Sequence, residues 1–572
     1  MNKFRPFILA VTVVCAALLA YGMFTLPKAK DSDAEGFSAA RVLEDIEVIS
    51  KDNHSVAHPE ERAQVRQYLI DRLETMGGKV SLYQYDSLVG PKGKHVEYVF
   101  DAVNVLADFP ASEQAEDETC LMFVAHYDSR YSTPMPKDTV WSYGAADDGY
   151  GVGVTLETVS QLLKHRQDWK QGVKVLFTDA EEVGMMGMKA AWENDRQLFD
   201  NVGLIINLEA RGTMGPALLF ETCPGNEKVM ELYESEARYP YTYSLTTVVY
   251  GFMPNFTDFT IVKDEIPGMN FSTIADINHY HTDLDNFSNV KPNSIQHYGE
   301  QILPVALKYV TDPAYADKNA LKAEKDTTNF TIPCLGLLNV SKAVYMVVNI
   351  VIFLLFLGVF ALEGVRGRLK SSVVLRNSCT VLCVAVGVLA LGELISYLCS
   401  AIAGARFKPF GIVQGVPFDN VAMIISIVLI AAVTVLVYCT LRRNAVRQKS
   451  GSMRASAAYN AASGFAYNML YGVLALMFVL SAVLLFALGE NLMFLIPLAF
   501  ATIALILRHV TSLKVWLLVA IFLILLHAFS FYYALTMALT IGAFGAVAML
   551  AFVDMMLLIP LSDIYLMAQR KK

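Results

Sequence analysis

Histidine and carboxylate side chains follow three apolar runs in the first half of this 572-residue sequence. They are His126 after Leu121–Ala125, Glu181 and Glu182 after Val173–Phe177, and Glu209 after Leu204–Leu208. Asp147 and Asp148 on a glycine-rich turn, and His281 within residues 278–283, add groups of the same kind. Imidazole and carboxylate groups without a nearby thiolate are typical ligands of a catalytic Zn²⁺, Mn²⁺ or Co²⁺ site. These residue types therefore indicate a metal centre that does chemistry.

A pair of such cations would explain why carboxylates outnumber imidazoles in this set. Two neighbouring cations need a carboxylate that bridges them and offsets their repulsion. Together they can polarise a carbonyl group and supply hydroxide near neutral pH. The reaction also needs a carboxylate that binds no metal and acts as general base. The adjacent Glu181 and Glu182 offer this division of labour.

The elements that must position these groups alternate between strand-like and helix-like patterns. Apolar, β-branched or aromatic runs, among them 98–106 and 246–250, are interleaved with helical stretches such as 57–78, 151–165 and 184–194. This alternation predicts an α/β fold around a mostly parallel sheet. In such sheets the functional crevice lies outside the carboxyl ends of the strands, where the candidate side chains would meet.

The charge is divided unevenly along the chain. Only 17% of the residues are charged and the net charge is -8, but residues 27–341 alone carry 27 basic and 48 acidic side chains, a net -21. Residues 342–572 carry 17 against 6, a net +11. An acidic soluble domain, 27–312, is therefore expected to continue through a solvated linker, 313–341, into an apolar membrane domain. The field of -21 argues against nucleic-acid binding, which needs a basic face.

Eight apolar stretches are long enough to cross the lipid bilayer, one before the acidic domain and seven after it. They are 7–26, 342–362, 376–400, 419–441, 464–488, 491–507, 514–530 and 535–560. The number of spans within 491–560 stays open. The first stretch reads as an uncleaved signal anchor, with a cleaved signal peptide as the alternative.

Basic residues in alternate loops predict the orientation. Lys3 and Arg5, the loops around residues 366–376, 442–454 and 508–514, and the tail 570–572 all fall on one side if there are eight spans. Such residues mark the cytoplasmic side. Both termini, including the tail 1–6, are therefore expected in the cytoplasm and the acidic domain outside it.

Five ordered motifs resemble those of the di-zinc aminopeptidase family of zinc exopeptidases. They are His126-x-Asp128, Gly144 to Gly151 around Asp147, Asp179-Ala180-Glu181-Glu182-x-Gly184, Asn207-Leu208-Glu209-x-x-Gly212 and Tyr280-His281-Thr282-x-x-Asp285. The match covers roughly residues 40–312, and the membrane-spanning plan resembles the endoplasmic reticulum metallopeptidase and vacuolar membrane protease branch. The motifs are specific because all five occur together in order.

The resemblance implies two Zn²⁺ ions and a role for each residue. His126 and Glu209 would hold one zinc, Glu182 and His281 the other, and Asp147 would bridge them, with Asp148 as the alternative bridge. Glu181 would be the general base, Asp128 would accept a hydrogen bond from His126, and Tyr280 would donate to the tetrahedral oxyanion. Glu209 stands where many members have Asp, and Asp148 where Asn is usual.

The sequence thus predicts a membrane-anchored di-zinc exopeptidase, an aminopeptidase acting on peptide substrates outside the cytoplasm. The length favours a bacterial inner membrane with a periplasmic catalytic domain, and an endoplasmic reticulum or vacuolar membrane with a lumenal domain is the alternative. A single-zinc acyltransferase of the glutaminyl-cyclase type and a non-catalytic membrane scaffold or transporter subunit are the other hypotheses. Nothing in the sequence indicates the oligomeric state.

Four residues outside the ligand set carry plainer expectations. Glu157 is expected to face solvent, Asp285 to cap or orient its loop, and Asp554 to reach the membrane surface from a span end. Arg211 could meet a substrate carboxylate or pair with a neighbouring acid.

Overall fold

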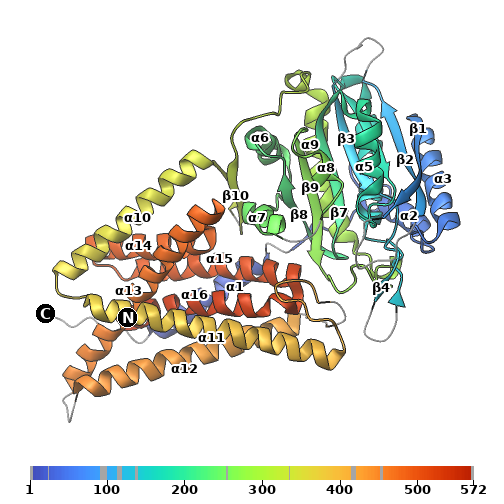
Figure 1. The fold of residues 1–572 in the computed structure, drawn as a ribbon. Coiled ribbons are helices and arrows are strands. Elements are labelled where there is room, and N and C mark those ends of the chain that lie inside the picture. Colours follow the sequence, from blue (N-terminus) through green and yellow to red (C-terminus); the bar gives the residue numbers. More distant parts are fainter. Residues whose placement is uncertain are drawn as a thin grey trace. The chain divides into compact units, whose positions relative to one another are not determined.

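The computed structural model describes residues 4–22, 25–90, 99–111, 119–134, 139–252, 256–333, 335–413, 416, 420–450 and 455–567. The chain forms two compact units. The sheet unit is Phe24–Lys342, and the helical unit combines Met1–Met23 with Ala343–Lys572. Figure 1 shows the strands of the first unit and the long helices of the second.

The sheet unit is built on seven strands in the order β1-β2-β6-β3-β7-β9-β8. The strands are β1 (Lys79–Val89), β2 (Val99–Phe109), β3 (Cys120–His126), β6 (Gly172–Thr178), β7 (Val202–Ala210), β8 (Met214–Thr222) and β9 (Gly268–Ala275). β6, β3, β7 and β9 run parallel to one another. The pairs β1–β2, β2–β6 and β8–β9 are antiparallel. The prediction of a mostly parallel α/β sheet is confirmed.

The central strands β3, β7 and β9 are buried at every position, because helices cover them. Such two-sided burial explains why β3 is an apolar run without alternation. The helices are α2 (Ala39–Ile49), α3 (Pro59–Thr75), α4 (Gly149–Leu163), α5 (Met186–Asn194), α6 (Glu227–Glu236), α7 (Ser244–Phe252), α8 (Phe259–Val262) and α9 (Pro292–Thr311). α4 and α9 pack against each other, α4 also against β3 and β7, and α9 against β8. This packing fixes the start of α4 beside the ends of the central strands.

Two local predictions in this unit are wrong. Residues 246–250 lie in α7 rather than in a strand, because the hydroxyls of Thr246 and Thr247 both donate to the Phe220 carbonyl of β8. Tertiary contacts therefore override the β-branched propensity. Glu157 is buried, not solvent-facing, and it accepts hydrogen bonds from the guanidinium of Arg41.

Two short hairpins complete the sheet unit. β4 (Thr133–Pro134) pairs with β5 (Thr139–Val140), and β10 (Thr327–Ile332) pairs with β11 (Gly336–Ser341). The second hairpin lies within the stretch expected as a linker. Its first strand is anchored where Asn226 accepts from the Thr327 amide at 2.8 Å and Thr242 donates to Asn329 at 3.0 Å.

The helical unit consists of long apolar helices. They are α1 (Arg5–Gly22), α10 (Lys342–Val365), α11 (Ser371–Ala403), α12 (Asn420–Ser450), α13 (Ala455–Leu488), α14 (Leu492–Thr511), α15 (Val515–Leu539) and α16 (Phe544–Leu566). The described residues contain seven segments that are long and apolar enough to cross a membrane. The last segment, Val515–Leu566, holds both α15 and α16, which a turn at Thr540–Ala543 separates. The chain is a multi-pass membrane protein. Among the orientation signals, Lys3, residues 451–454 and the tail 570–572 lie outside the described residues.

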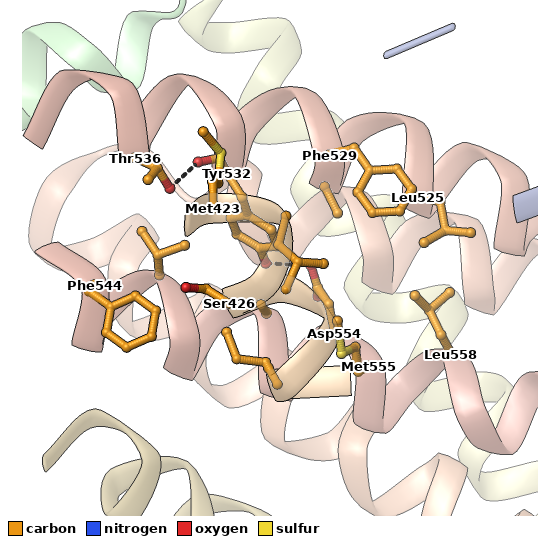
Figure 2. A pocket seen from close by; sticks show the side chains of 15 residues that line it. Met423, Ser426, Leu525, Phe529, Tyr532, Thr536, Phe544, Asp554, Met555 and Leu558 are labelled. Carbon is orange, nitrogen blue, oxygen red and sulfur yellow. Dashed lines mark hydrogen bonds between the residues drawn. The ribbon is translucent and has the colours of Figure 1, made fainter. Parts of the chain in front are cut away.

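A small apolar pocket lies among α12, α15 and α16, and a carboxylate lines it (Figure 2). The expectation that Asp554 reaches the membrane surface is wrong, because its side chain is buried and accepts a hydrogen bond from the Tyr532 hydroxyl at 2.5 Å. A carboxylate inside an apolar bundle needs such a donor, since no water solvates it there.

Candidate metal centre

Three neighbouring strands place candidate ligands at one edge of the sheet. His126 is the last residue of β3, Glu209 is the penultimate residue of β7, and Glu182 follows β6. Because β6, β3 and β7 are adjacent and parallel, their carboxyl ends lie side by side. The structure thus brings together the residues that the sequence placed at strand ends, for the reason given by the topology of α/β sheets.

The ligand atoms form two groups that share one carboxylate. In the first group, His126 Nε2 lies 3.3 Å from Asp147 Oδ1 and 3.7 Å from Glu209 Oε2. In the second, His281 Nε2 lies 3.2 Å from Asp147 Oδ2 and 3.1 Å from Glu182 Oε1. Within each group the atoms all lie within 4.8 Å of one another. Asp147 therefore presents one oxygen to each group, as a bridging carboxylate does.

The donor atoms of the two groups are arranged for cations. Asp147 Oδ2 and Glu182 Oε1 are buried and accept no hydrogen bond from the described residues. His126 Nδ1 lies 2.9 Å from the Asp128 carbonyl oxygen and donates to it, which leaves Nε2 facing the carboxylates of Asp147 and Glu209. Lone pairs facing one another in a buried site are unfavourable unless a cation lies between them. The residues present therefore fit a pair of divalent metal ions.

The pKa values of the carboxylates also bear on whether the site holds cations. Burial raises the pKa of Glu209 and of Glu181, and the neighbouring carboxylates raise both further, while His126 opposes the effect. Burial alone would also raise the pKa of Glu182, but His281 and Arg130 lower it below its usual range. Bound divalent cations favour the ionised forms of all three carboxylates, because they supply the largest local positive charge.

Asp147 and Asp148 have different surroundings although they are adjacent. Asp148 caps α4, because its Oδ1 accepts from the Gly151 amide at 3.0 Å and its Oδ2 from the His126 amide at 3.3 Å. Asp147 Oδ2 has no such donor within the described part of the chain. The geometry thus gives the helix-capping position to Asp148 and the shared position to Asp147.

Several further side chains orient the ligands. Arg130 Nη1 donates to Glu182 Oε2 at 3.1 Å and to the Glu182 carbonyl at 2.7 Å. Asn207 Nδ2 donates to Glu209 Oε1 at 3.1 Å. Asp285 accepts from the amides of Ala146 at 2.7 Å and Asp147 at 3.2 Å, so the expectation that it orients a loop is confirmed.

The contact made by Arg130 was not anticipated from the sequence, although this cation stands four residues after His126. The only signal for this contact in the sequence was the position of Arg130 shortly after a strand end, near candidate acidic ligands. Its role depends on the loop after β6 folding back over it, which no spacing rule reveals.

The residues expected to act on the substrate lie beside the two groups. The carboxylate of Asp128 accepts from the amides of Glu181 at 2.9 Å and Glu182 at 3.3 Å. His126 Nδ1 is hydrogen-bonded to the Asp128 carbonyl, whereas the carboxylate Oδ1 is 3.6 Å away. Asp128 thus holds the His126 tautomer through its backbone and the Glu181–Glu182 segment through its side chain. The Tyr280 ring stacks on His281 with 3.6 Å between centroids, and it lies within electrostatic range of Asp147 and Glu182.

An α/β sheet with histidine and carboxylate ligands at its carboxyl edge, and one carboxylate shared between two groups, defines a metallohydrolase-type domain. Residues 104–306 match the family model of Peptidase family M28. Over these residues the sheet unit is therefore similar to the M28 peptidases.

The similar curated proteins include endoplasmic reticulum metallopeptidases and vacuolar membrane proteases. Endoplasmic reticulum metallopeptidase 1 of Mus musculus is 28% identical over 231 residues, which cover 40% of this chain and 24% of that protein. Putative endoplasmic reticulum metallopeptidase 1 of Schizosaccharomyces pombe is 25% identical over 338 residues, or 55% and 39%. The vacuolar membrane protease of Verticillium alfalfae is 32% identical over 180 residues, or 30% and 16%. The chain matches about a quarter of the length of the first of these relatives, so the relationship is distant.

Two solved structures also align with the chain. A zinc aminopeptidase from Bacillus subtilis aligns over 51% of this chain and 99% of its own, with 12% identity and a TM-score of 0.38. A glutaminyl cyclase from Porphyromonas gingivalis aligns over 48% of this chain and 100% of its own, with 18% identity and a TM-score of 0.38.

Proposed function

We propose that this protein is a membrane-anchored di-zinc exopeptidase of the aminopeptidase type. The observation that carries the proposal is the pair of ligand groups that share Asp147. His126 and Glu209 would hold one zinc, and Glu182 and His281 the other. Zinc is favoured because imidazole nitrogen and carboxylate oxygen are its ligands in catalytic sites.

When bound, a zinc pair polarises the scissile carbonyl group and lowers the pKa of the attacking water. Glu181 is the one carboxylate of the Glu181–Glu182 pair that belongs to neither ligand group. It takes the proton of the attacking water and returns it to the leaving amine. Asp128 positions Glu181 by accepting from its backbone amide. The phenol of Tyr280 donates to the oxyanion that develops on the carbonyl oxygen.

We propose further that the sheet unit lies on the non-cytoplasmic side of the membrane. Arg366 and Arg368 lie in the turn between α10 and α11, and Arg376 lies in the first turns of α11. Basic residues in short connections mark the cytoplasmic face. α10 then runs outward from this turn to Lys342, where the sheet unit ends. We propose the bacterial periplasm as the compartment, with the lumen of an organelle as the alternative. A reporter enzyme that is active only outside the cytoplasm, fused after residue 341, tests the side.

The decisive test of the function is Glu181→Gln in the full-length protein. Turnover of peptides with a free N-terminus should fall by roughly 10²- to 10⁴-fold, while the zinc content stays at about two ions per chain. Glu193→Gln, at an exposed position of α5, is the matched control and should leave both unchanged. Retained turnover in the Glu181 variant would refute the mechanism.

The same preparation separates the rival hypotheses. Cleavage of free peptides but not of N-blocked ones establishes an aminopeptidase. One tightly held zinc with a cyclised product would indicate an acyltransferase instead. Bound zinc without hydrolysis across a broad peptide panel would indicate a non-catalytic domain.

A further inference from the structure

One arginine beside the candidate metal centre has no side-chain partner among the described residues. Arg211 follows β7 two residues after Glu209, and its backbone amide donates to the Thr273 carbonyl. Its side chain is half-buried and lies within electrostatic range of Tyr280, Tyr250 and Asp147. Among the described residues, no carboxylate lies within ion-pair distance of its guanidinium and no acceptor within hydrogen-bond distance. The expectation that Arg211 pairs with a neighbouring acid therefore fails within this part of the chain.

Two other arginines with low exposure in the sheet unit form ion pairs. Arg62 Nη1 donates to Asp179 at 3.1 Å, and Arg130 Nη1 donates to Glu182 at 3.1 Å. A guanidinium is costly to desolvate, and pairing with a carboxylate is the usual compensation. The guanidinium of Arg211 donates to no described residue, so it is available to an acceptor from outside the chain.

A second unused donor lies near Arg211. The Tyr250 hydroxyl is buried without a hydrogen-bond partner in the described structure. Tyr250 lies within electrostatic range of Arg211, and also of Glu209 and Glu181. Its ring is fixed by an edge-on contact with Phe220, at 4.9 Å between centroids. Arg211 and Tyr250 are thus two hydrogen-bond donors that lack an acceptor among the described residues, and they lie near the ligand group that contains Glu209.

We propose that Arg211, assisted by Tyr250, binds a carboxylate of the peptide substrate close to the scissile bond. A carboxylate offers two oxygens in the planar geometry that a guanidinium matches, and it can accept from a phenol as well. The substrate class is therefore short peptides whose C-terminal carboxylate falls near the metals, or peptides with an acidic side chain at that position. The inference rests on the proposed peptidase function.

The test measures binding and turnover in the zinc-loaded full-length protein. The binding probes are a reduced Leu-Ala pseudodipeptide, in which CH₂–NH replaces the scissile amide, its C-terminal amide, and the corresponding amide with Asp in the second position. Wild-type protein should bind the free acid roughly 10- to 100-fold more tightly than the plain amide. Arg211→Met should abolish that preference and leave the affinity for the plain amide unchanged. When the parent peptides are hydrolysed, the variant should lose the same preference through a higher KM rather than a lower kcat. Arg211→Lys should restore part of it. Arg238→Met, at an exposed arginine, is the matched control.

The outcomes separate the carboxylate sources and the competing explanations. Tight binding of the acid alone assigns Arg211 to the C-terminal carboxylate, and tight binding of the Asp amide assigns it to an acidic side chain. Equal affinity of wild-type protein for all three probes, or no binding of any, overturns the proposal. A fall in kcat that is the same for acid and amide peptides overturns it in favour of oxyanion stabilisation. A wild-type protein that discriminates the probes but hydrolyses no peptide refutes the peptidase function and leaves the carboxylate site standing.

Discussion

A buried histidine far from the metal centre is expected to make the sheet unit sensitive to acid. His297 lies on α9, and its Nδ1 accepts from the Ala217 amide at 3.1 Å and from Gln301 Nε2 at 2.9 Å. Both contacts require an unprotonated Nδ1. Burial lowers the pKa of His297 to about 3, and Glu300 and the Tyr239 carbonyl offset only part of that effect. The folded protein therefore holds this imidazole neutral.

The magnitude follows from the difference between the folded and the unfolded chain. An exposed histidine takes up its proton near pH 6.5, so the unfolded state gains protons below that pH while the folded state does not. Stability is fully present above pH 6.5 and is lost as the pH falls toward 3. The linkage relation gives a loss of about 1.4 kcal/mol between pH 7.5 and 5.5, and about 2.7 kcal/mol by pH 4.5. For a unit of this size, the first of these corresponds to a fall in Tm of roughly 2 °C.

His297→Asn should remove this part of the acid sensitivity while keeping an acceptor for the Ala217 amide. The assay is thermal unfolding of the full-length protein followed by tryptophan fluorescence at pH 7.5, 6.5 and 5.5. Three of the four tryptophans, Trp141, Trp169 and Trp192, lie in the sheet unit, so the signal reports mainly on it. His165→Asn, at an exposed position, should keep the wild-type pH dependence. Parallel wild-type and His297→Asn curves would refute the reasoning, because they would show that the buried imidazole binds its proton as readily as an exposed one.

Two further predictions concern the metal centre. Asp147→Asn should lower the zinc content to about one ion per chain or less, because the amide offers only one oxygen to two groups. Asp148→Ala should keep both ions and cost about 1 kcal/mol through loss of the α4 cap. The reverse pattern, read by metal analysis and thermal unfolding, would make Asp148 the bridge. Arg130→Met should weaken zinc binding by roughly 10- to 100-fold, because Glu182 loses the donor that orients it; chelator competition measures this, and Arg196→Met, at an exposed arginine, should have no effect.

The positions of the strand-end ligands could be predicted because their signal is local. β3 is an uninterrupted apolar run up to His126, and β7 is apolar up to Asn207, so the polar residues at the ends of these runs stand out in the sequence. The parallel topology then brings His126 and Glu209 together without further information. Where a local pattern competed with a tertiary contact, the prediction failed, as at residues 246–250. There two threonine hydroxyls found an acceptor on β8 that lies more than 25 positions earlier in the chain.

The choice between neighbouring carboxylates could not be made from spacing alone. Asp147 and Asp148 differ in what their oxygens meet, and that depends on how the turn before α4 sits against His126 and the loop after β9. Likewise, the buried position of Glu157 depends on Arg41, which lies 116 residues away. Sequence periodicity describes one element at a time, whereas these contacts join elements that are distant in the chain.

The two ligand groups are also coupled through a residue that binds neither metal. Asp285 lies four residues after His281, in the loop that follows β9, and its carboxylate accepts from the amides of Ala146 and Asp147. A third contact, from the Ser142 hydroxyl at 3.1 Å, ties the same carboxylate to the start of that turn. The loop that supplies His281 therefore holds the turn that supplies the shared carboxylate. Because Asp147 contributes to both groups, a movement of either loop changes the spacing of all the ligands at once. The strands fix two ligands independently, but the second histidine and the shared carboxylate can only be positioned together.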